Sequence, residues 1–518
     1  MNYDQGAAKA YENMASDRDV FLTRARTCAE LTIPTLMPRD GHTGSTQYDT
    51  PYQAVGARGV NNLASKLLMT LLPPNSPFFR LTIDDFDLVE LAGNARGKAE
   101  DALARIERSA AQVIESKAIR VPTFEMLKQL IVAGNALIHM PPEGGMKVFR
   151  LDRFVVKRDT MGNILKIVVK ETIAYEALPK DVQEALLETE GYQEQIEKKE
   201  CDLYTCIKRD GKKFMVHQEV HGVVIPKTTG SYPQDKLPWL ALRFIAVDGN
   251  DYGRSYVEEI VGDLKSLEAL TRAIVEGSAA SAKLIFMVRP NGTTKIRNIA
   301  DSTNGAIISG DANDVSTLQA NKFNDFRVAQ ETMNTITQRL SYAFLLNSSV
   351  QRQAERVTAE EVRYMAQELE TALGGIYSVL SQEFQLPLVN LLLAKMQKEG
   401  KMPKFPKDTL KPQIVTGLEA LGRGQDLNKL QAFLQYLQPL GQQVIAQELN
   451  IDDYIDRLAA SLGIDTQGLI KSPEQKQQEQ MAAQEAMQQQ QMMQMAEKGV
   501  APTVKGMVDA AGQQQVEE

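Results

Sequence analysis

Apolar residues recur at the three-and-four spacing of amphipathic helices along much of the chain. This spacing predicts helices over 5–32, 53–72 and 97–118, the second closed by Pro73 and Pro74. Two further helices are predicted over 254–283 and 323–346. The first of these ends in the small residues GSAASA, which allow another helix to approach closely. The chain is therefore predicted to be mainly helical.

Two regions interrupt the helical spacing with β-strand patterns. From about 146 to 247, β-branched runs are separated by turn signals, and Asp210-Gly211 predicts a hairpin. A second set of strands and turns is predicted over 284–320, between the two long helices. Helix, β insert, helix is unusual for a globular enzyme. The fold class expected from the pattern is α+β.

The remainder of the chain changes character three times. The polar segment NSSVQRQAERV (347–357) is followed by Thr358, which is predicted to cap a helix with Glu361 three residues later. Gly374-Gly375 and Pro387 predict a kink in that helix. Helices are expected again within 417–470. From Ser472 onward Gln, Met, Ala and Glu dominate, a composition that cannot bury a core alone.

Composition narrows the classes of protein. A chain of 518 residues is too long for one core, so two or more packed units are expected. The formal net charge of −8 argues against tight binding of nucleic acid over a wide surface, but not against surrounding DNA. Three cysteines and the lack of a long apolar run favour a reducing compartment and no membrane partner. We expect an intracellular protein, or one released by lysis.

The strongest candidate for catalysis or metal binding is the set Cys201, Cys206, His217 and His221. Its spacing approaches a two-Cys, two-His zinc pattern, so a zinc-dependent enzyme is one alternative. On a strand, however, the two cysteines would face opposite sides, which favours four ordinary sheet residues. The neighbouring HQEVH places Glu219 one residue late for a metalloprotease, and the chain holds no G-x-x-x-x-G-K-[ST] phosphate loop. The sequence thus predicts no cofactor, no metal and no catalytic residue.

One polar feature indicates contact with a polyanion. Arg352 and Arg356 lie in the polar segment between two predicted helices. A solvated loop explains the same spacing equally well.

Four stretches of the sequence resemble the portal proteins of T7-like podoviruses: YQAVGARGVNNLASKLLMTLLPPNSPFFRL (52–81), GRSYVEEIVGDLKSLE (253–268), ERVTAEEVR (355–363) and LGGIYSVLSQEFQLPL (373–388). The resemblance extends over roughly 5–470. Portal proteins of this kind form a closed ring, usually of twelve subunits, in which each subunit has a wing, a two-helix stem, a β-containing clip and a helical crown.

The resemblance implies an assignment of the chain to these parts. The wing would be 1–253, the stem helices 254–283 and 323–346, the clip 284–322, the tunnel loop 347–357, the kinked wing helix and its connection 358–412, the crown 413–471 and a mobile tail 472–518. The tunnel loop would face DNA through Asn347, Gln351, Arg352 and Arg356.

The resemblance also implies partners and a location in the virion, at the portal vertex between head and tail. The chain would pass double-stranded DNA without sequence specificity. It would meet the large subunit of terminase and then a tail adaptor at the clip, major capsid and scaffolding proteins around the wing, and internal core proteins at the crown. Composition alone favours a second alternative, a helical scaffold without a pore.

Overall fold

The computed structural model describes twelve ranges of the chain and scattered positions between 475 and 489. The ranges are 6–74, 78–82, 95–141, 144–187, 200–281, 285–318, 323–346, 359–373, 375–400, 413–416, 423–441 and 448–462. The chain divides into two compact units, Met1–Asp426 and Leu427–Glu518.

The first unit is built around two helices that are buried on nearly every side. They are α2 (Val55–Leu71) and α5 (Arg120–Ala133). Leu63, Leu67 and Leu71 of α2 are fully buried, and burying each leucine contributes roughly 1.5–3 kcal/mol relative to an exposed side chain. The helix α5 ends at Gly134, whose φ of +73° is open to glycine at little cost. A Cβ there would lie 2.5 Å from the backbone of Arg254.

Strands β2 (Asn135–His139), β3 (Lys147–Phe149) and β10 (Trp239–Arg243) form a small antiparallel sheet in the order β10-β2-β3. The strand β2 starts directly after Gly134, so the turn at that glycine connects the central helices to the sheet. A separate pair joins β1 (Phe79–Thr82) to β13 (Gln413–Thr416).

A larger antiparallel sheet has the order β4-β5-β6-β7-β8, with β9 paired to β7. Its strands are β4 (Phe154–Arg158), β5 (Ile164–Ala174), β6 (Glu200–Asp210), β7 (Lys213–Val220), β8 (Val223–Val224) and β9 (Gly230–Pro233). The hairpin predicted at Asp210-Gly211 is confirmed, because Asp210 pairs with Lys213 in register.

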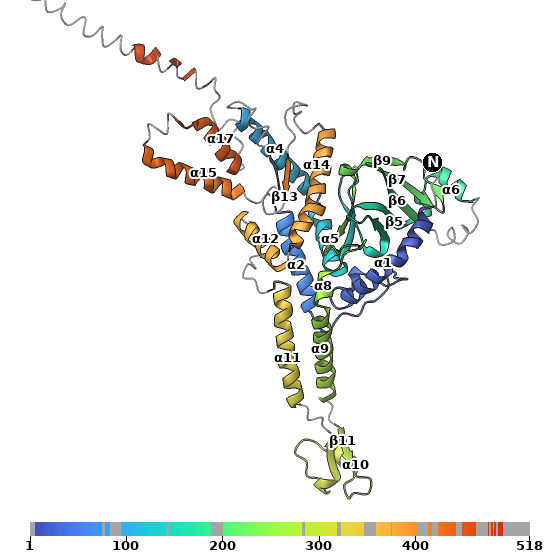
Figure 1. Cartoon of the computed structure of the whole chain (residues 1–518). Coiled ribbons are helices and arrows are strands. Elements are labelled where there is room, and N and C mark those ends of the chain that lie inside the picture. Colours follow the sequence, from blue (N-terminus) through green and yellow to red (C-terminus); the bar gives the residue numbers. More distant parts are fainter. Residues whose placement is uncertain are drawn as a thin grey trace, which may run out of the picture. The chain divides into compact units, whose positions relative to one another are not determined.

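Alternate residues of this sheet enter different apolar clusters, as the two-residue period of a strand requires. Phe154 and Val156 face the main core, whereas Val155 faces the long helix α1 (Ala7–Glu30). Figure 1 shows α1 beside this sheet. The short helix α6 (Lys180–Leu187) covers the third cluster.

The helix predicted to kink is confirmed as a broken rod. It consists of α12 (Ala359–Leu373), α13 (Ile376–Leu380), the π-helical turn η6 (Ser381–Gln385) and α14 (Leu386–Lys398). Gly375 has a φ of +90°, and Pro387 lies in the first turn of α14. Along the rod Leu369, Tyr377 and Phe384 are fully buried against the main core, so the kinks keep its apolar residues on the core.

The helix α4 (Ala95–Ser116) confirms the third predicted helix. Short 3-10 turns complete the first unit: η1 (Pro34–Leu36), η2 (Leu151–Arg153), η3 (Tyr175–Ala177) and η4 (Gln234–Lys236).

The end of α15 (Arg423–Leu437) and the helix α17 (Ile451–Leu462) belong to the second unit. Within it the hydroxyl of Tyr454 donates to the carbonyl of Leu430 at 3.4 Å. Most of the tail expected over 472–518 lies outside the described residues. Among the described helices, none is long and apolar enough to cross a membrane.

Candidate functional site: a stalk, its β unit and a clamped helix end

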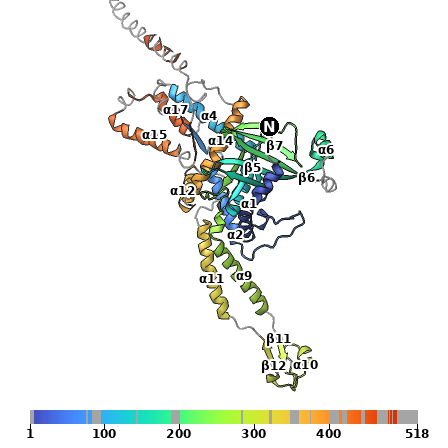
Figure 2. The ribbon, with the colours of Figure 1, turned by 45° about the vertical axis from the view of Figure 1, so that its right-hand side comes forward.

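Two helices, α9 (Val261–Ser281) and α11 (Phe323–Ala343), form a stalk (Figures 1 and 2). They correspond to the two long helices predicted from the sequence. The first differs from the prediction of one helix over 254–283, because the short helix α8 (Tyr256–Glu259) precedes it. The Ser255 hydroxyl caps α8 by accepting from the Glu258 amide, and Ile260, with φ −113° and ψ 11°, separates the two helices.

The stalk buries apolar residues only at the end nearest the core. There the buried residues are Leu264, Leu267, Ile336 and Leu340, and Arg339 pairs with Asp263 at 2.7 Å. Farther along, Gly277 lies against Phe326: a Cβ on the glycine would come within 2.9 Å of the ring. Val275 and Val328 are 49% and 61% exposed. Two helices with apolar residues on their outer faces leave surface available for further helices.

A small β unit lies between the two stalk helices in the chain. It contains β11 (Ile285–Val288), α10 (Ile296–Ala300), the turn η5 (Ala312–Asp314) and β12 (Val315–Leu318), and β11 pairs antiparallel with β12. These elements confirm the strands and turns predicted over 284–320.

The carboxylate of Asp314 organises the turns of this β unit. Its Oδ2 accepts from the amide of Thr293 at 2.7 Å, from the amide of Thr294 at 3.1 Å and from both threonine hydroxyls at 3.2 Å. Burial alone would raise the pKa of Asp314, but these hydrogen bonds outweigh burial and lower the pKa from its usual value of 3.8. Gly292 allows the approach, since a Cβ there would lie 2.4 Å from the carboxyl carbon.

The outside of the β unit is apolar where its inside is polar. Its exposed large apolar side chains are Phe286, Met287, Ile296, Ile307 and Ile308, with exposed fractions from 42% to 102%. The buried residues of the unit, Thr294 and Asp314, are both polar. Exposed apolar residues gathered on one small unit mark a surface for contact with another protein.

The end of α11 is held by the central helix α2. The ring of Phe344 packs on Gly59, where a Cβ would come within 2.3 Å of the ring. The Asn62 amide donates to the carbonyls of Phe344 at 2.9 Å and Leu345 at 3.1 Å. The Lys66 ammonium donates to the Leu345 carbonyl at 3.1 Å. We call these contacts the α11 clamp.

The α11 clamp fixes an unusual backbone conformation. Leu345 has a φ of +54°, and the Leu346 amide donates to the Ser341 carbonyl at 2.8 Å, which closes the helix. Such a conformation costs a non-glycine residue about 1–3 kcal/mol and persists where its surroundings impose it. Lys66 also pairs with Glu368 of α12 at 3.4 Å. The clamp therefore touches both elements that flank 347–358.

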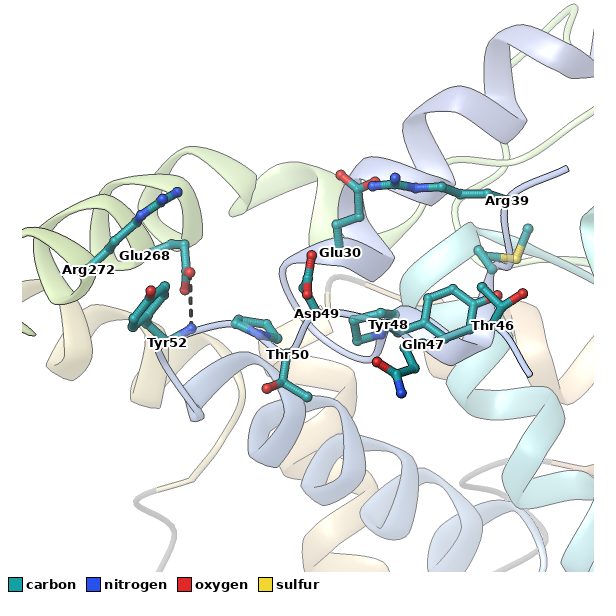
Figure 3. Close-up of a pocket in the computed structure, with 13 residues that line it drawn as sticks. Glu30, Arg39, Thr46, Gln47, Tyr48, Asp49, Thr50, Tyr52, Glu268 and Arg272 are labelled. Atoms are coloured by element: carbon teal, nitrogen blue, oxygen red, sulfur yellow. Dashed lines mark hydrogen bonds and ion pairs between the residues drawn. The ribbon is translucent and has the colours of Figure 1, made fainter. Parts of the chain in front are cut away.

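A third set of contacts ties the stalk to the start of α2. The Glu268 carboxylate on α9 accepts from the amides of Tyr52 at 3.0 Å and Gln53 at 3.2 Å (Figure 3). Glu268 lines an open polar pocket of about 820 Å³ with Glu30, Arg39, Tyr48 and Arg272. The guanidinium of Arg272 lies 5.8 Å from the centre of the Tyr52 ring. These contacts fix the angle at which α9 leaves the core.

Comparison with known proteins identifies the family. The family described as "Bacteriophage head to tail connecting protein" matches residues 4–470. The chain is 44% identical over 484 residues to the portal protein of Escherichia phage T7, and 45% identical over 482 residues to that of Enterobacteria phage T3. Each match covers 92% of this chain and 90% of the relative. The chain belongs to the family of bacteriophage head-to-tail connecting proteins.

A more distant relative is the portal protein of Enterobacteria phage SP6, which is 30% identical over 505 residues, 96% of either chain. A solved structure similar to this one is the neck of an empty gene transfer agent particle. It has a TM-score of 0.36 and 11% identity and covers 73% of this chain and 86% of its own, too weak a likeness to add to the assignment. As a connector of a short-tailed phage, the chain is a virion protein of the junction between head and tail.

The four residues predicted to face DNA, Asn347, Gln351, Arg352 and Arg356, lie outside the described residues, as does the predicted cap Thr358. The structure instead describes the connector's α11 clamp, which holds the helix end immediately before them. The sequence carried a signal for it, because Asn62 and Lys66 are polar residues four positions apart, on one face of an otherwise apolar helix.

The four residues of the alternative zinc site do not come together. Cys201 lies in the apolar cluster under α6, whereas Cys206 lies in the cluster under α1, on the opposite face of β6. His217 pairs with Cys206 across the sheet, but His221 lies in the turn after β7 with a φ of +48°. Burial raises the pKa of Cys206, which disfavours the thiolate that binds metal. In the described ranges, no three His, Cys, Asp or Glu residues are placed to hold a metal ion.

Glu219, considered above for its likeness to a metalloprotease base, has a structural partner. Its Oε1 accepts from the Ala8 amide at 2.9 Å, at the start of α1. Burial would raise the pKa of Glu219, but hydrogen bonds from His217 and from the helix amides lower it. The carboxylate thus caps α1 and attaches that helix to the sheet.

Proposed function

We propose that this chain assembles into a closed ring, of twelve subunits as is usual in its family, through which double-stranded DNA enters and leaves the head. The observation that supports this best is the stalk. Its helices bury apolar residues on one side near the core and expose others, including Val275 and Val328, along their outer faces. Side-by-side packing of identical stalks around an axis would cover those faces and close the ring.

The charge of the chain suits DNA that slides. Each phosphate neutralised by a Lys or Arg adds to the affinity through counterion release, so a wholly basic channel would hold DNA in place. A chain with a net charge of −8 avoids this if basic residues face DNA at few points. We place one such point in the tunnel loop, with Asn347, Gln351, Arg352 and Arg356 toward the DNA.

The exposed apolar residues of the β unit support a role in docking. We propose that terminase binds there during packaging and that a tail adaptor replaces it afterwards. Major capsid and scaffolding proteins would surround the wing, where the ring would initiate capsid assembly, and internal core proteins would meet the crown. The ring would position these partners and catalyse no reaction itself.

Electron microscopy of the purified full chain, with particle mass on the same sample, tests the ring. We expect a hollow ring of about 690 kDa, twelve times the chain mass of 57.5 kDa. Solid oligomers without a pore would contradict the proposal and favour the helical scaffold instead.

The tunnel loop is tested by changing Arg352 and Arg356 together to Ala. We expect rings to form normally while packaged DNA is lost or retained less well, as measured by the DNA content of particles. A failure of ring assembly would show that these arginines are structural instead.

A further inference from the structure

A second hollow, apart from the stalk and its β unit, lies in the first unit beside α14. This groove has a volume of about 290 Å³. Its walls are the end of α4, the turn at 140–145, the segment 232–238 and the last two turns of α14. Figure 1 shows α4 and α14 in the same part of the molecule. We call it the α14 groove.

The floor of the α14 groove is apolar and continuous with the main core. Ile119 and Leu392 belong to the core and are 1% and 2% exposed. Val113, Met140 and Tyr232 pack against the core but remain partly exposed. An apolar floor open to solvent is a surface that a partner's apolar side chains can cover.

The rim of the α14 groove is basic. Four lysines line it: Lys117, Lys236, Lys395 and Lys398. The described residues that line the groove include no Asp or Glu. Lys117 and Lys395 meet above Gly144, where a Cβ would lie 2.8 Å from Nζ of Lys395 and 3.0 Å from Cε of Lys117. Two ammonium side chains that converge over an apolar floor favour an anionic group between them.

Helix ends account for only part of this charge. Lys395 and Lys398 lie in the last turn of α14, and Lys117 follows the last residue of α4. Each helix C-terminus carries about half a negative charge, so the two ends together offset about one of the four lysines. The rim therefore keeps a positive potential.

We propose that the α14 groove binds an acidic peptide segment of a partner protein, with the segment's apolar side chains on the floor and its carboxylates on the lysines. The lining of α14 supports this form of ligand, because Leu391, Ala394, Lys395 and Lys398 follow the three-and-four spacing of one helix face. A peptide that alternates apolar and acidic residues matches that face. DNA would use the lysines but not the floor, since phosphates need no apolar contact. The proposal does not depend on the ring or on DNA passage.

The test measures binding of labelled peptides to the full chain by fluorescence anisotropy. The probe is a helix-forming peptide of about 14 residues with Leu at every third or fourth position and Glu between them. We expect binding that weakens as salt is raised, because the Debye length falls from about 10 Å at 0.1 M to about 3 Å at 1 M. Replacing Glu by Gln, or Leu by Ser, in the peptide should raise Kd about tenfold or more.

The matched variants are two double substitutions. Lys395→Gln with Lys398→Gln should raise the Kd of the acidic peptide about fivefold to tenfold. Lys180→Gln with Lys212→Gln, two exposed lysines outside the groove, should leave Kd unchanged. Thermal unfolding of both variants checks the fold, and the salt and peptide series test the proposal without any variant.

Three outcomes would overturn the proposal. The first is equal binding of the Glu and Gln peptides, which would leave only an apolar site. The second is an equal loss in both lysine variants, which would indicate general charge attraction. The third is displacement of the peptide at physiological salt by a short DNA duplex at a similar concentration, which would make the groove a nucleic-acid site.

Discussion

The α11 clamp and the β unit are both attached to the stalk, yet they place polar and apolar groups in opposite ways. At the clamp, apolar packing is closed: Phe344 is fully buried against Gly59, and polar groups on α2 are used only to hold a helix end. In the β unit, a buried carboxylate holds the turns together, and apolar side chains such as Ile307 face solvent.

This difference separates two ways in which a structure can serve a function. The clamp uses tight packing to hold one backbone conformation, at the cost of a non-glycine residue with a φ of +54°. The β unit folds through local hydrogen bonds, and this leaves its apolar residues available for a partner. Changes at the clamp should therefore affect the whole fold, whereas changes in the β unit should affect binding.

Deletion of 284–320 with a short Gly/Ser linker in its place should have the largest effect. We expect the ring to assemble and the binding of terminase and tail adaptor to be lost, because the exposed apolar surface is removed while the core is not touched. Pull-downs with each partner measure the loss, and particle mass measures assembly. Unchanged recruitment would contradict the docking role of the β unit.

The next largest effect is expected for Gly59→Ala, on stability. A Cβ at this position would lie 2.3 Å from the Phe344 ring, and forcing an extra methyl group into a packed core costs about 1–3 kcal/mol. The control is Gly262→Ala on α9, where a Cβ meets no atom within 4 Å and helix propensity favours alanine. Chemical denaturation should show the loss for Gly59 only. Equal stability of the two variants would remove the clamp from the account.

The sequence predicted the elements well wherever one period ran for long enough. The helices over 5–32 and 53–72, the hairpin at Asp210-Gly211 and the kink at Gly375 are confirmed. The break at Ile260 was not predicted, because Ile260 itself continues the apolar stripe of the helix. Helix α5 was not predicted either. It is buried on nearly every side and so has little amphipathic contrast, and it carries Pro122 in its first turn.

The sites were less predictable than the elements. The contacts of Asp314 join residues about twenty positions apart across irregular turns, and no period along the chain marks such a contact. The α14 groove combines lysines from three separated segments, each of which alone indicates only a solvated helix end or turn. Charge converges there through tertiary packing, which spacing along the chain does not encode.

Asn62→Ala should have a smaller effect than Gly59→Ala. It removes hydrogen bonds to the carbonyls of Phe344 and Leu345, so we expect a loss of about 1–2 kcal/mol in the free energy of unfolding. Its neighbour Asn61 is exposed on the same helix, and Asn61→Ala is the matched control. Protease cleavage within 347–358 should become faster in the Asn62 variant alone. Similar cleavage of both variants would mean that the clamp does not control the segment that follows it.

Asp314→Asn should have the smallest effect on the whole fold, because its contacts are confined to the β unit. The pKa of Asp314 is lower in the folded chain than its usual value of 3.8, so the carboxylate stabilises the unit above that pH. This contribution is lost as the pH falls through the lowered pKa, because the protonated acid resembles the amide. Hydrogen exchange at the Thr293 and Thr294 amides should therefore be faster in the variant at pH 7, and the difference from the unaltered chain should shrink toward pH 3. Asp301→Asn, at an exposed position of the same unit, should exchange like the unaltered chain throughout. A pH-independent difference for Asp314→Asn would show that the shape of the side chain holds these turns and its charge does not.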